Sequence, residues 1–138
     1  MTRAHVVRAI LLALAAAALY VGAWALFVPR SMFDSFPGFG RAWLRTFPPY
    51  NEHLVRDVGG FNLMMAALFI WAAVTLDRRL VRAAALTSLL FALPHLIFHV
   101  FHLGGLTAGD QVAQLGSLAL AVVLPLVAVM LVGREQDA

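Results

Sequence analysis

The sequence contains no cysteine and no lysine, and charged residues make up only 12% of its 138 residues. The absence of cysteine excludes disulfides, thiolate metal ligands, a cysteine nucleophile and covalent haem attachment through cysteine. All ten basic residues are arginines. A chain rich in Ala, Arg, Leu, Val and Gly but free of lysine is typical of a GC-rich bacterial genome, so we expect a bacterial protein.

Hydrophobic residues make up 62% of the chain. An average soluble domain carries about 25% charged residues, so this is the composition of a membrane protein. The arginines are dispersed at helix ends and in one loop, without the basic stripe that nucleic acid binding requires. We therefore predict contact with the lipid bilayer and no nucleic acid partner.

Four stretches are long enough to cross a bilayer, which takes about 20 apolar residues at a rise of about 1.5 Å each. They are Val6–Val28, Leu54–Leu76, Ala83–Leu103 and Val112–Val132. The first is too long for a cleavable signal peptide. Short connections after the second and third stretches make their helices antiparallel neighbours. We predict an all-α fold, in which residues 1–138 form one transmembrane antiparallel four-helix bundle.

The distribution of arginines predicts the orientation, because cytoplasmic loops carry more of them. One side would carry Arg3, Arg8, Arg78, Arg79, Arg82 and Arg134, and the other Arg30, Arg41, Arg45 and Arg56. Both termini are therefore predicted to be cytoplasmic, in the bacterial cytoplasmic (inner) membrane.

The loop Pro29–Tyr50 alternates aromatic residues with charged ones, and its Pro-Gly and Pro-Pro pairs divide it into short pieces. We expect it to lie in the outer interface, with one short amphipathic helix around Gly40–Thr46. An aromatic belt packed on the bundle is a simpler interpretation of this loop than a moving lid.

Ionisable residues inside a span are costly and usually mark function. Here they share helix faces at the outer end, because residues spaced i, i+4, i+7 lie on one face. The second stretch carries His53, Asp57 and Gly60 in this pattern, and the third carries His95, His99 and His102. Gly60 would let the neighbouring backbone come close.

Imidazole and carboxylate groups bind zinc, iron or copper, and two histidines one helical turn apart can share an ion. His95 and His102 lie about 10 Å apart along the axis, too far to share one ion comfortably. The predicted ligands are His53, Asp57, His99 and His102. Glu52 and His95 would support these ligands or bind a second ion.

Four polar neighbours would orient the ligands: Asn51, Arg56, Asp110 and Gln114. Each also has a structural interpretation. Asn51 and Asp110 can cap the helices that follow them. Arg56 can pair with Glu52 one turn away or with the adjacent Asp57.

The resulting hypothesis is a metal site in the outer half of the membrane, which would suit a metalloenzyme with hydrolytic or oxidoreductase chemistry on a lipid-soluble substrate. One alternative is a haem- or quinone-associated redox subunit. A proton or ion pathway is a weaker one, because the inner halves of these helices have few polar residues. A last alternative is a structural or assembly subunit, within a homo-oligomer or a larger membrane complex.

Two segments, 50–59 (YNEHLVRDVG) and 94–102 (PHLIFHVFH), resemble those of a group of small bacterial four-helix membrane proteins without an assigned activity. In size and number of spans the chain also resembles the DoxX-like proteins, which are linked to quinone and thiol redox chemistry. This second resemblance concerns architecture only. Neither resemblance implies a reaction.

Overall fold

The structure is a computed structural model that describes residues 2–47 and 49–133. These residues form five α-helices and one 3-10 helix. The elements are α1 (Arg3–Phe27), α2 (Pro29–Ser35), η1 (Trp43–Thr46), α3 (Glu52–Thr75), α4 (Arg78–Val100) and α5 (Ala108–Gly133). The prediction of an all-α fold with four long apolar helices is confirmed.

Four helices, α1, α3, α4 and α5, are long and apolar enough to cross a membrane, which is the pattern of a multi-pass membrane protein. Many of their large apolar side chains are exposed and suit contact with lipid. Their ends differ from the predicted ones by a few residues. Helix α4 begins at Arg78 rather than Ala83, because the side chain of Asp77 caps it by accepting a hydrogen bond from Leu80 N at 2.8 Å.

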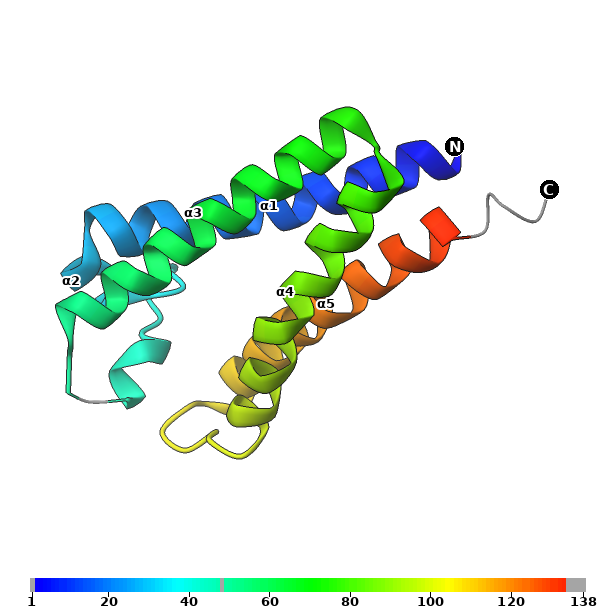
Figure 1. Ribbon diagram of the computed structural model, residues 1–138. Helices are drawn as coiled ribbons and strands as arrows, with labels where there is room; N and C mark the ends of the chain where they lie inside the picture. The colour runs from blue at the N-terminus through cyan, green and yellow to red at the C-terminus, as the bar shows by residue number, and fades with distance from the viewer. Residues whose placement is uncertain (1, 48, 134–138) are drawn as a thin grey trace.

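The long helices form two antiparallel pairs, α1 with α3 and α4 with α5 (Figure 1). The start of α1, the turn between α3 and α4 and the end of α5 lie together, and we call this the inner end, following the predicted orientation. From there the two pairs diverge, so that α2 and η1 lie at the far end of one pair and the α4–α5 loop at the far end of the other. The two pairs therefore share a core at the inner end, whereas at the outer end they are connected through the segment between α1 and α3, which contacts α4 and α5. Arg134, one of the arginines used to predict the orientation, lies outside the described residues.

The buried core lies where the pairs converge. Small residues make up much of it, and Ala72, Ala84 and Ala128 from three different helices are fully buried. Larger apolar side chains of α1, including Leu11, fill the space between them. Small side chains let helix backbones approach closely, so the inner halves of all four helices share one core.

Two glycines hold α1 and α3 together in their outer halves. A Cβ atom at Gly59 would lie only 2.5 Å from the backbone nitrogen of Leu26, and one at Gly22 would lie 2.9 Å from that of Leu63. The close approach expected at Gly60 is therefore made by Gly59, since nothing lies within 4 Å of a Cβ built on Gly60. The prediction erred by one residue, which on a helix rotates the contact to another face.

Aromatic rings connect the segment between α1 and α3 to both helix pairs. Trp24 of α1 contacts Phe36, whose ring meets that of Trp43 edge-on at 5.9 Å between centroids. Further along, Phe47 reaches α4 and contacts His99 at 5.5 Å. The 3-10 helix η1 lies within the range predicted for a short helix, whereas α2 has no counterpart in the prediction.

We expect Gly59→Ala to lower the free energy of unfolding by about 1–3 kcal/mol, because the added methyl group must displace the α1 backbone. Gly60→Ala is the matched control on the same helix; it should be neutral or stabilising by up to about 1 kcal/mol, since alanine favours helix over glycine. Denaturant unfolding of the purified proteins, followed by circular dichroism, would measure both. Equal losses for the two variants would contradict the assigned contact.

Candidate functional site

The predicted site residues of α3 form contacts among themselves at its outer end. Asn51 caps the helix by accepting a hydrogen bond from Leu54 N at 3.1 Å. Arg56 pairs with Glu52 at 2.8 Å, one turn away, and also donates to the carbonyl oxygen of Leu26. The capping and pairing roles considered for Asn51, Arg56 and Glu52 are thus present in the structure.

His53 and Asp57 face outward on the same helix. The imidazole Nε2 of His53 lies 3.4 Å from a carboxylate oxygen of Asp57, and the two side chains are 87% and 60% exposed. Asp57 lies about 10 Å outside the middle of α3, at a rise of about 1.5 Å per residue. A carboxylate so exposed at this depth would meet lipid unless another group covers it.

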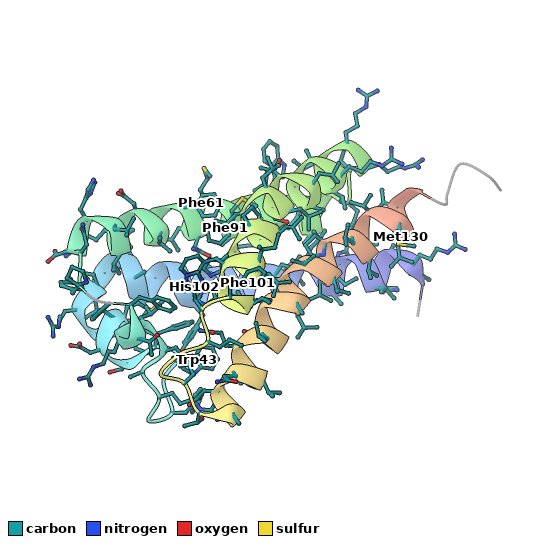
Figure 2. The ribbon with its side chains drawn as sticks, turned by 90° about the horizontal axis from the view of Figure 1, so that it is seen from below. Trp43, Phe61, Phe91, Phe101, His102 and Met130 are labelled. Atoms are coloured by element: carbon teal, nitrogen blue, oxygen red, sulfur yellow. The ribbon has the colours of Figure 1, made fainter. Side chains whose placement is uncertain are left out.

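On α4, His95 and His99 belong to a column of rings. Phe91 stacks on His95 with centroids 4.9 Å apart and planes at 19°, and His95 meets His99 edge-on at 4.7 Å. The column starts at α3, because Phe61 contacts Phe91 at 5.0 Å; Figure 2 shows these two rings side by side. Aromatic contact therefore joins α3 to α4 immediately inside the histidines.

His102 does not continue this column. Helix α4 ends at Val100, so His102 lies in the turn that follows. Its ring stacks on Phe98 at 4.0 Å and its Nδ1 lies 2.7 Å from the carbonyl oxygen of Phe98. The spacing i, i+4, i+7 places three residues on one face only while the helix continues, which explains why His102 is oriented differently.

His99 and Gln114 are the two buried polar residues of the described chain, 6% and 4% exposed. They lie on α4 and α5, the two helices of one pair. Neither His99 Nδ1 nor Gln114 Oε1 has a hydrogen-bond partner among the described residues. Buried polar atoms normally have partners, and His99 and Gln114 lie close enough to influence each other, so they are the natural partners of one another between α4 and α5.

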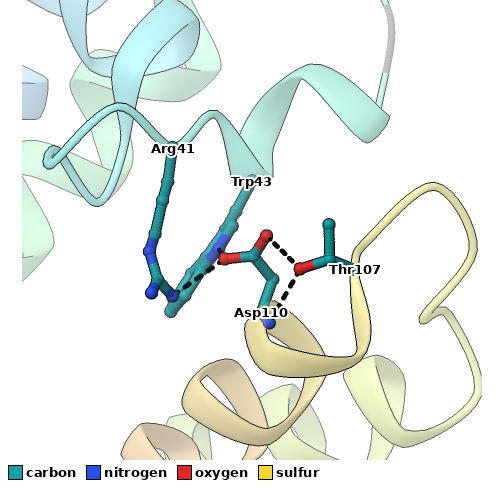
Figure 3. A network of polar contacts seen from close by, with 4 residues as sticks. All are labelled: Arg41, Trp43, Thr107 and Asp110. Carbon is teal, nitrogen blue, oxygen red and sulfur yellow. Dashed lines mark hydrogen bonds and ion pairs between the residues drawn. The ribbon is translucent and has the colours of Figure 1, made fainter.

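Asp110 is engaged in a different network, which Figure 3 shows. One carboxylate oxygen accepts hydrogen bonds from Arg41 Nη1 and Trp43 Nε1, both at 2.8 Å. The other accepts from Thr107 Oγ1 at 2.7 Å, and Thr107 Oγ1 in turn accepts from Asp110 N at 3.2 Å. Asp110 thereby ties the loop between α1 and α3 to the start of α5.

The structure does not bring the predicted metal ligands together. Within residues 2–47 and 49–133, no three His, Asp or Glu side chains are placed to hold a metal ion. His53 and Asp57 lie on one helix pair and His99 on the other, and the pairs diverge at this level. The metal site therefore stays a prediction.

The contact between Phe61 and Phe91 sets the register of α3 and α4, which run antiparallel. One turn further out, the same spacing of four residues leads to Asp57 on α3 and His95 on α4. A second turn leads to His53 and His99. His53 and Asp57 of α3 thus lie the same number of helical turns beyond the Phe61–Phe91 contact as His99 and His95 of α4 do.

Sequence reasoning missed Arg41, Trp43, Phe47 and Thr107. The signal for Thr107 was available, since Thr followed three residues later by Asp is typical of a helix start. Nothing in the order of residues pairs Trp43 with Asp110, 67 positions away.

Comparisons of the chain with models of protein families, with curated proteins and with solved structures give no match.

We expect Asp110→Ala to release the loop, because the buried indole of Trp43 and the guanidinium of Arg41 would lose their shared acceptor. A hydrogen bond to a charged group is stronger than one between neutral groups, so losing both should loosen the loop. Limited trypsin digestion should then cleave at Arg41 or Arg45 faster than in the wild type.

Asp34→Ala is the control for this experiment. Asp34 pairs with Arg30 at 2.6 Å at the surface, and this hydrogen bond raises the pKa of Arg30. Exposed pairs contribute at most about 1 kcal/mol, so cleavage at Arg41 and Arg45 should not change. Unaltered cleavage of Asp110→Ala would show that the network does not hold the loop.

Proposed function

We propose that this membrane protein binds a transition-metal ion, zinc, iron or copper, between the outer halves of α3 and α4. The observation that carries the proposal is the register set by Phe61 and Phe91. By helical spacing, Asp57 and His95 are each one turn beyond this contact, and His53 and His99 are each two turns beyond it. Two ligands one turn apart on each of two facing helices are a common way to hold an ion in a bundle.

Binding would require the outer ends of the two pairs to approach. The inner core can stay as it is, because the candidate ligands all lie outside the Phe61–Phe91 contact. Phe47 packs edge-on against His99 and would have to yield there. The approach would also cover the exposed carboxylate of Asp57, which lowers its cost in the membrane.

In this proposal His95 takes the place of His102 among the ligands. His95 and His99 already touch, whereas His102 is stacked on Phe98 and bonded to the backbone. An ion held by His53, Asp57, His95 and His99 would have four protein ligands, the number found at closed structural zinc sites. The proposed role is therefore metal-dependent closure of the bundle rather than catalysis at that ion.

The absence of cysteine makes a direct test possible, since two introduced cysteines would be the only sites for spin labels. Leu54→Cys and Ile97→Cys place labels at exposed positions of α3 and α4, beside the candidate ligands. Pulsed electron paramagnetic resonance should show a shorter distance between the labels when Zn²⁺ is added.

Asp57→Asn should abolish this shortening. It should also weaken zinc binding at least ~10–100-fold, which is the loss expected even when only a residue that supports a metal ligand is removed. Glu52→Gln is the matched control, because Glu52 pairs with Arg56 and is not a ligand in this proposal. His102→Ala tests whether His102 is indeed replaced by His95 as a ligand. Both controls should bind zinc as the wild type does. Absence of zinc binding by a folded wild type would overturn the proposal.

A second candidate is a planar, lipid-soluble ring compound of the quinone class. The stacked pair Phe91–His95 favours it, because Phe91 is 39% exposed and an imidazole can donate to a quinone carbonyl. Asp57→Asn distinguishes the candidates: it should abolish zinc binding and leave binding of a short-chain benzoquinone unchanged. Haem as the ligand would appear as a Soret absorbance band.

A further inference from the structure

A small cavity lies at the inner end of the molecule, at the opposite end of α4 from His95 and His99. It has a volume of about 50 Å³ and is lined by residues of α1, the α3–α4 turn and the end of α5. The lining is apolar except for two arginines, Arg3 and Arg78. One water needs about 10–15 Å³ measured in this way, so the cavity has room for a larger polar group.

Arg78 carries two buried nitrogen atoms, Nε and Nη2, that have no hydrogen-bond partner among the described residues. These two atoms form one edge of the guanidinium, the edge that binds two oxygens of a phosphate or carboxylate side by side. Arg78 as a whole is half-buried, but this edge is shielded from solvent, and a shielded donor without an acceptor is costly. The geometry therefore calls for an anion with two oxygens.

Among the described residues at this end, no carboxylate is free to accept hydrogen bonds from Arg78. Asp77 is the acidic residue there, and its side chain caps α4 by accepting from Leu80 N. Arg8, by contrast, is satisfied by the carbonyl oxygen of Ala73 at 3.0 Å. Arg79 and Arg82 are exposed and add further positive charge around the cavity.

The position of the cavity indicates the source of the anion. It lies between the first turns of α1 and α4 and the last turn of α5, where these apolar spans meet the membrane surface. Phospholipid phosphates lie at this depth, and anionic lipids concentrate at the cytoplasmic leaflet. Val7, Leu76 and Leu131 would border the apolar part of the same molecule.

We propose that Arg78, assisted by Arg3, binds the phosphate of an anionic phospholipid at the inner end of the bundle. The proposal is independent of the metal site, because no residue is shared. Arg78 would hold two non-bridging oxygens through Nε and Nη2, and Arg3 would contribute charge at the rim.

Native mass spectrometry of the full-length protein, titrated with phosphatidylglycerol and with phosphatidylcholine, would test it. We expect the wild type to bind phosphatidylglycerol more tightly than phosphatidylcholine. Arg78→Gln should weaken phosphatidylglycerol binding by about tenfold or more, as expected for the loss of charged hydrogen bonds. The matched control Arg79→Gln, one residue away and exposed, should change it by less than about threefold.

Arg78→Lys keeps the positive charge but lacks the planar edge with two donors. It is a second variant that tests the proposal even where Arg78→Gln does not fold. Its affinity should lie between those of the wild type and Arg78→Gln. Equal effects of Arg78→Gln and Arg79→Gln would overturn the proposal, since they would indicate general attraction to the basic surface.

Two further measurements distinguish the lipid from other anions that Arg78 could bind in the same way. Inorganic phosphate should not displace the lipid at millimolar concentration; displacement that depends on Arg78 would make free phosphate the ligand and overturn the lipid assignment. Glu135→Gln with Asp137→Asn removes the acidic residues that follow α5 in the sequence. If Arg78→Gln affects lipid binding only in this background, a carboxylate of the chain is the partner and the proposal is wrong.

Discussion

The convergence of the four long helices on one small-residue core is the constraint on which the rest of the structure depends. Ala72, Ala84 and Ala128 let three helix backbones meet around the apolar side chains of α1 at the inner end. Outward from this core the facing residues become aromatic and ionisable, from Phe61 and Phe91 to Asp57 and His95. These groups cannot replace an apolar core, so the pairs separate where the core stops.

The two pairs are held in different ways. In the α1–α3 pair, Gly22 and Gly59 bring the backbones together well into the outer half. The α4–α5 pair instead buries His99 and Gln114 there. The first pair is therefore fixed by shape, whereas the second holds two polar groups that are natural partners of one another. Asp110, through Arg41 and Trp43, limits how far the outer ends can move apart.

The four spans and the clustering of polar residues at one end could be predicted from the sequence, because both follow from length, hydropathy and helical spacing. Individual contacts could not. The sequence does not tell which of Gly59 and Gly60 contacts the neighbouring helix. Only the packing of Leu26 against Gly59 identifies the contact. His102 was assigned to the stripe of His95 and His99, since the end of α4 at Val100 has no glycine or proline to mark it. The divergence of the pairs depends on long-range packing, which no local pattern encodes.

The two ends of the molecule differ in the groups that they offer. At the inner end the core is closed, and its polar feature is one buried guanidinium edge suited to an anion. At the outer end α3 and α4 diverge, and the residues proposed as metal ligands lie on both helices without meeting. A rigid inner core is what makes a ligand-driven change at the outer end feasible, because approach of α3 and α4 can pivot on the Phe61–Phe91 contact without repacking the residues inside it. In the proposed function an ion would supply what apolar packing cannot, because it would attract the imidazole and carboxylate groups at the outer ends of α3 and α4.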